Sequence, residues 1–164
     1  MSDSIIRLIL PGDSRFSVVL HASITAVALE LAELGYLTDG TALADEIYLA
    51  AHEACMNIID HAYKAEPARF VFITVQANAA NRTIEVVLED NGRAYDPHAQ
   101  EWPPMASWHT HQTCDGPIYV LDNVPEPDIF QERGRGLYLM TQLLESVSYQ
   151  PRPNNNCWHL LKRY

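Results

Sequence analysis

Two polar side chains in the second quarter of the chain are spaced for chemistry. Glu53 and Asn57 lie four residues apart, so in an α-helix they project from one face, a single turn from each other. A carboxylate can take a proton from a hydroxyl group, and the neutral amide oxygen of Asn is a ligand that Mg²⁺ accepts. Asn is also a poor residue for a helix interior. The pair therefore indicates a candidate site for metal-assisted chemistry.

The polar stripe that carries this pair also has a simpler interpretation. By helical spacing it includes Glu46, Asp60 and His61. In most amphipathic helices such a stripe is simply the side that meets water. A solvated stripe usually pairs Glu with Lys or Arg one turn on, whereas here Asn57 follows Glu53. From this helix alone, both a functional site and a solvated face remain open as interpretations.

A second candidate is an acidic residue at the end of a predicted strand. Strict alternation over residues 83–90 places Asp90 on the apolar side of that strand, where its carboxylate needs a hydrogen-bond donor. Alternatively, Asn91 and Gly92 form a tight hairpin turn that Asp90 merely flanks. The residues that follow do not resume an alternating strand, so the turn leads into a different kind of segment. The sequence leaves the two alternatives evenly balanced.

A third candidate is the pair Gly134 and Gly136 at the start of a predicted helix. Glycines at a helix start let backbone amides approach a phosphate closely, and the helix dipole favours negative charge there. Two glycines before a helix are also ordinary turn chemistry. The sequence contains neither a P-loop motif nor the glycine fingerprint of dinucleotide-binding folds. A phosphate cradle of another type is the hypothesis.

Hydrophobic periodicity predicts the elements that must position these residues. We expect a strand at 5–10, helices over 16–34 and 42–64, a hairpin of strands 70–77 and 83–90, a helix opened by residues 134–136, and strands 146–150 and 157–163. This order predicts an α+β fold in two layers. A mixed, mostly antiparallel sheet would be covered on one face by three helices.

One segment, about residues 97–133, shows no sustained periodicity. It holds six of the ten prolines, and long irregular segments in compact domains are usually lids, binding loops or disordered stretches. The segment also carries His98, His109, His111 and Cys114. The last three could hold a transition metal, but the cluster lacks a clear fourth ligand, and exposed loop side chains are the better interpretation. We predict a lid.

Length and charge narrow the function. The 164 residues suffice for one domain spanning 1–164. The formal net charge of −10 disfavours nucleic acid and anionic membranes as partners. With only two lysines, arginines, backbone amides or a metal would have to hold an anion. The N-terminus has no cationic region followed by a cleavable apolar core, so the cytoplasm is the expected compartment.

The three candidates occur in an order that resembles a known superfamily. Residues 53–63 (EACMNIIDHAY), 90–97 (DNGRAYDP) and 134–137 (GRGL) are similar to the sequence boxes of the Bergerat-type ATP-binding fold. Gyrase, a heat-shock chaperone, histidine kinases and a mismatch-repair protein share that fold. The chain looks most like the bacterial anti-sigma-factor serine kinase branch. Near the C-terminus it departs from that branch, with Asn156-Cys157 where Gly-Thr is usual.

The resemblance implies a role for each matching residue. Asn57 would bind the Mg²⁺ that bridges the phosphates of ATP, and Glu53 would orient or deprotonate the attacking hydroxyl. Asp90 would accept a hydrogen bond from the adenine amine, and Gly92 would let the backbone approach the base. The phosphate-binding amides would come from Gly134 and Gly136. The flanking Arg133 and Arg135 are candidates for neutralising phosphate charge, or are solvated arginines beside a turn.

The resemblance also implies a biological role. The first hypothesis is an ATP- and Mg²⁺-dependent protein serine/threonine kinase that binds a sigma factor or phosphorylates a STAS-type anti-anti-sigma protein in a partner-switching system. The alternative is a nucleotide-binding module that sequesters a protein without phosphoryl transfer. The resemblance further suggests a homodimer through the first strand and helix. A histidine kinase is disfavoured because the chain leaves no room for a phosphoacceptor helix pair.

Overall fold

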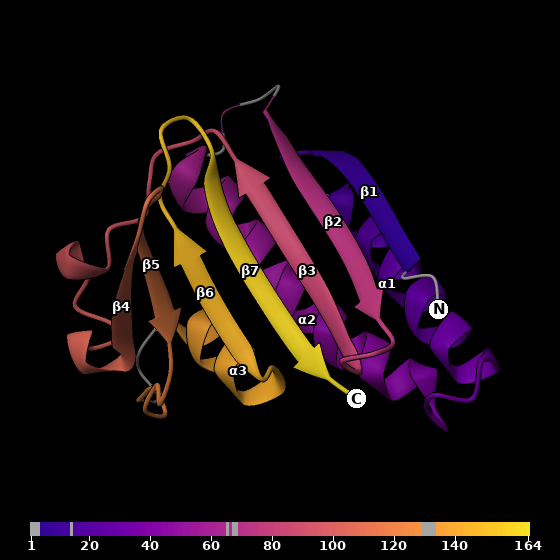
Figure 1. The fold of residues 1–164 in the computed structure, drawn as a ribbon. Helices are drawn as coiled ribbons and strands as arrows, with labels where there is room; N and C mark the ends of the chain where they lie inside the picture. Colours follow the sequence, from indigo (N-terminus) through magenta and orange to yellow (C-terminus); the bar gives the residue numbers. More distant parts are fainter. Residues whose placement is uncertain (1–3, 14, 65, 67–68, 129–133) are drawn as a thin grey trace.

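The chain folds around one seven-stranded sheet (Figure 1). The structure is a computed structural model that describes residues 4–13, 15–64, 66, 69–128 and 134–164. The strands are β1 (Ser4–Pro11), β2 (Phe70–Asn78), β3 (Thr83–Asp90), β4 (Trp108–Thr113), β5 (Gly116–Leu121), β6 (Ser146–Gln150) and β7 (Asn156–Arg163). Their order across the sheet is β1-β2-β3-β7-β6-β5-β4, and every pairing between described strands is antiparallel.

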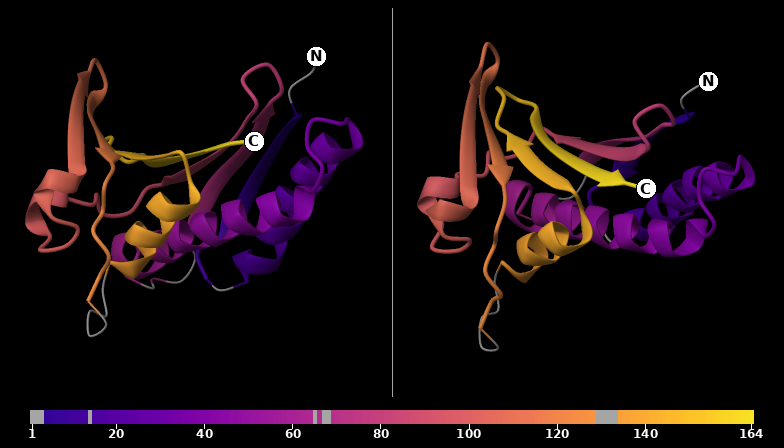
Figure 2. Two further views of the ribbon diagram at one scale, coloured as in Figure 1. Left: turned by 90° about the horizontal axis from the view of Figure 1, so that it is seen from below. Right: turned by 60° about the horizontal axis from the view of Figure 1, so that its bottom comes forward.

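Three helices lie on one face of this sheet (Figures 1 and 2). They are α1 (Phe16–Glu33), α2 (Gly40–Asn57) and α3 (Arg135–Leu143). The described residues place no element on the opposite face (Figure 2). This arrangement confirms the predicted α+β fold with three helices on one side of the sheet.

The core lies between the sheet and the helices because each element buries the side that its sequence pattern makes apolar. In β2 every second residue is buried, and in α1 the buried residues recur at intervals of three or four. The members of these two stripes are Val71, Ile73, Val75 and Ala77, and Phe16, Leu20, Ile24, Val27, Ala28 and Leu31. The predicted hairpin of 70–77 and 83–90 forms, with Val75 opposite Val86.

Helix α1 is long and apolar enough to cross a membrane by length and composition, with a mean hydropathy of 1.4. In this fold 33% of the helix is buried, as a stripe that packs within the domain core. Several apolar residues remain on its outer side, among them Val18, which is 78% exposed, and Leu29. The helix is therefore a core helix with an additional apolar surface.

The predicted helix over 42–64 differs from the structure at both ends. Helix α2 begins at Gly40, where the side chain of Asp39 accepts a hydrogen bond from the Thr41 amide at 2.8 Å. After Asn57 the chain continues as a π-helical turn, Ile58–Ala62, closed by a bond from the Tyr63 amide to the Ile58 carbonyl. Such turns widen a helix locally and are frequent at functional sites. Asn57 therefore lies where the helical geometry changes.

The segment 97–133 contains more regular structure than its sequence pattern predicts. Residues 108–121 form the hairpin β4–β5, which extends the sheet at the edge opposite β1 (Figures 1 and 2). Strand β4 shows no alternation of apolar and polar residues, because Trp108 is its one buried residue. A usable signal was present in Asp115-Gly116, a dipeptide that favours tight hairpin turns. The expectation of an irregular segment was wrong for this hairpin.

Candidate functional site

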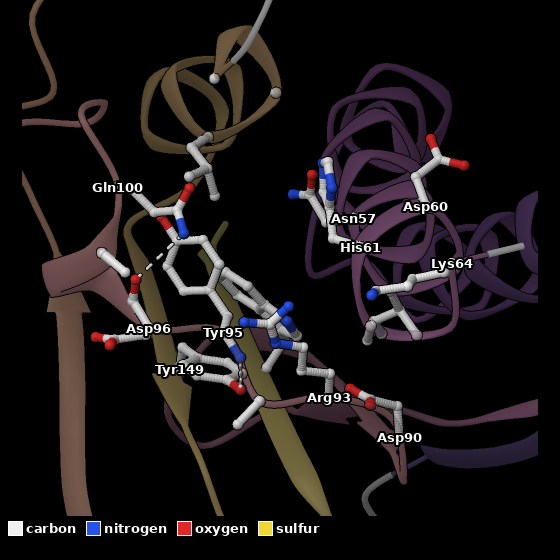
Figure 3. A pocket seen from close by; sticks show the side chains of 18 of the residues that line it. Asn57, Asp60, His61, Lys64, Asp90, Arg93, Tyr95, Asp96, Gln100 and Tyr149 are labelled. Carbon is white, nitrogen blue, oxygen red and sulfur yellow. Dashed lines mark hydrogen bonds between the residues drawn. The ribbon is translucent and has the colours of Figure 1, made fainter.

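A cavity of about 390 Å³ lies between α2 with its π-helical turn, the start of α3 and the segment that follows β3 (Figure 3). The predicted site residues that line it are Asn57, Asp90, Gly134 and Gly136. Four positions from three distant parts of the sequence thus share one hollow. A cavity of this size can hold a small organic ligand.

Asn57 presents its amide to the cavity from the last turn of α2 (Figure 3). Its Nδ2 atom is buried and has no hydrogen-bond partner among the described residues. A buried amide N–H without a partner is unfavourable for folding. A ligand with a hydrogen-bond acceptor at this place would remove that cost. The neutral carbonyl oxygen of the same amide is a donor type that suits Mg²⁺.

Glu53 lies one turn before Asn57, beside the cavity. Its side chain is about two-thirds buried, and Oε2 lies against Gly136 so closely that a Cβ atom at position 136 would overlap it. Its other oxygen, Oε1, is 4.0 Å from Nδ1 of His52. The contact between Glu53 and Gly136 joins α2 to the first turn of α3. It places a carboxylate next to a glycine that lines the cavity.

Asp90 ends β3 as a buried acid, 2% exposed, which fulfils the expectation from alternation. Its Oδ1 accepts hydrogen bonds from the Gly92 amide at 2.8 Å and from Nδ2 of Asn156 at 3.0 Å. Burial raises the pKa of Asp90, and these two hydrogen bonds partly offset that rise. Within the described part of the chain, no hydrogen bond is made to Oδ2. That oxygen remains available to a ligand with a donor group.

Gly92 has a packing role in the structure. A Cβ atom at this position would lie 2.7 Å from the carbonyl oxygen of Ala62, at the end of the π-helical turn. The next residue, Arg93, donates its amide to that same carbonyl at 3.0 Å. The glycine thus lets the turn after β3 press against α2 and its extension. The proposed approach of its backbone to a base stays a prediction.

The start of α3 has the predicted form. Gly134 caps the helix with a φ of 85°, a left-handed conformation that favours glycine, and the helix begins at Arg135. The guanidinium of Arg135 donates to the backbone carbonyl of Asp128 at 3.4 Å, and Arg135 does not line the cavity. Its predicted contact with phosphate stays a prediction. Arg133 lies outside the described residues.

Aromatic side chains form a wall of the cavity that the sequence interpretation did not include. Tyr149 and Trp158 face each other across β6 and β7, with ring centroids 4.7 Å apart. Tyr95 stands edge-on to Tyr149 at 5.8 Å, and its amide donates to the Tyr149 hydroxyl at 2.8 Å (Figure 3). Burial raises the pKa of Tyr95 to about 12. Flat apolar rings of this kind suit a planar ligand such as a nucleobase.

Charged groups also reach the cavity. Lys64, just after the π-helical turn, and Arg93, in the segment after β3, both line it (Figure 3). Lys64 is therefore a candidate to bind an anion. The composition by itself predicts arginines, backbone amides or a metal in that role. Both cations could offset phosphate charge. In the sequence, Lys64 directly follows the motif at residues 53–63, and Arg93 lies within the motif at residues 90–97.

Two of the histidines and the cysteine of the segment 97–133 do not line the cavity. His109, His111 and Cys114 are exposed residues of the β4–β5 hairpin. Within the ranges that the structure describes, no three His, Cys, Asp or Glu side chains are grouped to hold a metal ion. The weaker hypothesis of a transition-metal site is not supported by this arrangement.

The fold and a family match together define an ATP-binding class of protein. Residues 20–162 match the histidine kinase-like ATPase domain family, and the chain belongs to that family. It is similar to serine-protein kinase RsbW of Bacillus velezensis, with 27% identity over 154 residues, which cover 92% of this chain and 81% of the relative. RsbW of Bacillus subtilis is 25% identical over 147 residues, which cover 88% of this chain and 77% of that protein.

A further relative is more similar over a shorter stretch. Serine/threonine-protein kinase BtrW of Bordetella bronchiseptica is 31% identical over 108 residues, which cover 66% of this chain and 62% of that protein. The resemblance to the serine kinase branch of the ATP-binding superfamily is thereby confirmed.

Proposed function

We propose that this chain is an ATP-dependent protein serine/threonine kinase that works as an anti-sigma factor in the cytoplasm. The observation that carries the proposal is the shared cavity of Asn57, Asp90, Gly134 and Gly136, with Glu53 against one of these glycines. The similarity to RsbW and BtrW, both named as protein kinases, supports the same activity.

In this proposal the cavity holds ATP in a defined orientation. The carboxylate of Asp90 accepts a hydrogen bond from the adenine amine while Tyr149 and Trp158 contact the base. The first-turn amides of α3, from Gly134 to Gly136, bind the phosphates, assisted by Arg133 and Arg135. We propose that the parts of the segment 97–133 outside the β4–β5 hairpin, residues 97–107 and 122–128, serve as the lid over the nucleotide.

Asn57 is the residue that would hold Mg²⁺ together with the phosphates. The fit rests on its side-chain oxygen, which is of the type that Mg²⁺ prefers. The Nδ2 atom, which has no partner within the described chain, would be satisfied by an acceptor such as a phosphate oxygen. When bound, the ion offsets the charge of the β- and γ-phosphates.

Glu53 supplies the acid–base chemistry. Its carboxylate takes the proton from the serine or threonine hydroxyl of the protein substrate as the hydroxyl oxygen bonds to the γ-phosphorus. The bond from that phosphorus to the oxygen bridging the β- and γ-phosphates breaks at the same time. The products are a phosphorylated partner and ADP, so atoms and charge balance.

The protein partners follow from the same proposal. The unphosphorylated STAS-type anti-anti-sigma protein is the substrate, and the sigma factor is the ligand that the chain holds when that protein is phosphorylated. We also propose a homodimer through β1 and α1. The described residues leave the outer edge of β1 unpaired, and Ile9 of β1 and Val18 of α1 are 65% and 78% exposed. Large exposed apolar groups of this kind favour a protein interface.

The test is phosphoryl transfer to the partner. The purified chain is incubated with γ-labelled ATP, Mg²⁺ and the STAS-type protein encoded beside it, and we expect label on that protein. Glu53→Gln should lower the rate at least about 100-fold. The matched control is Glu46→Gln on the same helix, because Glu46 pairs with Lys162 at 2.6 Å instead of reaching the cavity, and its rate should be unchanged. ATP binding without any label would instead indicate a sequestering module.

A further inference from the structure

A tryptophan from the segment 97–133 reaches the start of α3. The indole of Trp102 lies against Gly134, where its Cδ1 atom occupies the space that a side chain at position 134 would need. Its Nε1 is 2.7 Å from the ideal position of such a Cβ atom. The pyrrole edge of the ring therefore contacts the backbone residue that caps α3.

Among the described residues, the N–H group of this indole has no acceptor. Nε1 of Trp102 is buried, and no described residue accepts a hydrogen bond from it. An indole nitrogen can only donate, so the missing partner must be an acceptor. A buried donor left unpaired is unfavourable by the cost of removing it from water, and native structures rarely contain one without a reason.

The position of Trp102 indicates what the acceptor is. Trp102 lines the same cavity as Asn57, Gly134 and Gly136. The capping Gly134 and the first turn of α3 offer further donors, and the amino end of the helix dipole favours negative charge there. A ligand that reaches this part of the cavity must therefore bring acceptor oxygens.

We propose that Trp102 is a further nucleotide-binding residue, whose Nε1–H group donates a hydrogen bond to a phosphate oxygen. The inference rests on the proposed ATP site and extends it by a residue outside the three motifs. It also connects the residues between β3 and β4 to the phosphates directly, through a side chain that already contacts the helix cap.

Two matched variants test this proposal by calorimetry. Trp102→Phe removes the N–H group and keeps an aromatic ring. Trp108→Phe is the control, because its Nε1 is also buried without a partner among the described residues, yet Trp108 does not line the cavity. We expect Trp102→Phe to weaken ATP and ADP about tenfold and leave adenosine unchanged, since a hydrogen bond to a charged group is lost. Trp108→Phe should bind all three ligands like the parent.

Other outcomes separate this inference from the proposed function. Unchanged ATP affinity in Trp102→Phe would overturn the inference while the parent still binds and transfers phosphate. An equal loss for adenosine and ATP would also overturn it, because the effect would then arise from the base site or from the fold. A parent chain that binds no ATP would reject both proposals. Thermal denaturation of each variant shows that the domain remains folded.

Discussion

Nδ2 of Asn156 donates hydrogen bonds to Oδ1 of Asp90 at 3.0 Å and to the carbonyl oxygen of Gly92 at 3.1 Å. Asp90 and Asn156 are direct partners in the pairing of β3 with β7. One amide thus fixes both the buried carboxylate and the turn that follows it. The departure from the usual Gly-Thr near the C-terminus therefore has a structural role at the candidate adenine site.

Asn156→Ala should weaken ATP binding by about 1–2 kcal/mol, because the Asp90 carboxylate loses one of the two donors that orient it. Isothermal titration calorimetry measures the affinity. The control is Asn155→Ala, since the neighbouring Asn155 donates instead to Glu89, at 2.8 Å, and its loss should leave the affinity unchanged. Equal affinities for the parent and Asn156→Ala would show that this hydrogen bond does not orient the carboxylate for ATP.

Asp90→Asn should reduce ATP affinity by about 1–3 kcal/mol, because the inverted amide sets a donor against the adenine amine. A variant that binds ATP as well as the parent would exclude Asp90 from base recognition.

The same variant has a pH signature in folding stability. Burial holds the pKa of Asp90 above its ordinary value of 3.8, so the folded state retains the proton to higher pH than the unfolded state. The contribution of the Asp90 proton to the free energy of unfolding is fully present below pH 3.8. It is lost as the pH rises through the raised pKa of the folded state. The parent should therefore gain unfolding free energy relative to Asp90→Asn as the pH falls through that window. Urea denaturation at several pH values measures it, and a constant difference would contradict the pKa shift.

Asn57→Ala should weaken ATP binding about tenfold or more in the presence of Mg²⁺, because the proposed ligand oxygen is lost. Binding of ADP in a chelator should change much less, since no ion is then involved. Comparing calorimetric titrations with and without Mg²⁺ separates these effects. A similar loss in both conditions would assign Asn57 to the nucleotide and not to the ion.

Gly136→Ala should lower phosphoryl transfer about 100-fold, because the new methyl group displaces the Glu53 carboxylate that lies against position 136. In a Glu53→Gln background the same substitution should have little further effect on the rate. Single-turnover transfer rates of the four proteins form the cycle that measures this coupling. Independent, multiplicative losses would mean that the two residues do not act together.

Several features of the site could be predicted from the sequence because they depend on local geometry. The helical period places Glu53 and Asn57 one turn apart, and strand alternation buries Asp90 beside its apolar neighbours. The start of α3 at Arg135 likewise follows from the glycines that open a helical pattern. The motifs also identified the family, which the match over residues 20–162 confirms.

Other features could not be predicted because they either join positions distant in the chain or leave no periodic apolar pattern. The hydrophobic pattern of residues 108–113 does not predict a strand. The reason is that β4, which pairs with β5 at the edge of the sheet, is mostly exposed and buries little apolar surface. The aromatic wall needs Tyr149 and Trp158 to meet in the register of β6 with β7. The π-helical turn after Asn57 is closed by one backbone hydrogen bond that helical periodicity does not reveal.

By itself the sequence determined the residue types, their spacing along each element and the side of each element that is apolar, because covalent geometry and the hydrophobic effect act within a few residues. Only the tertiary structure decided that Asn57, Asp90 and Gly134 line one cavity, that Asn156 holds Asp90, and that Trp102 covers Gly134. Those relationships depend on strand register and on how helices pack against the sheet. Both are set by the burial of the whole core, and no single segment contains that information.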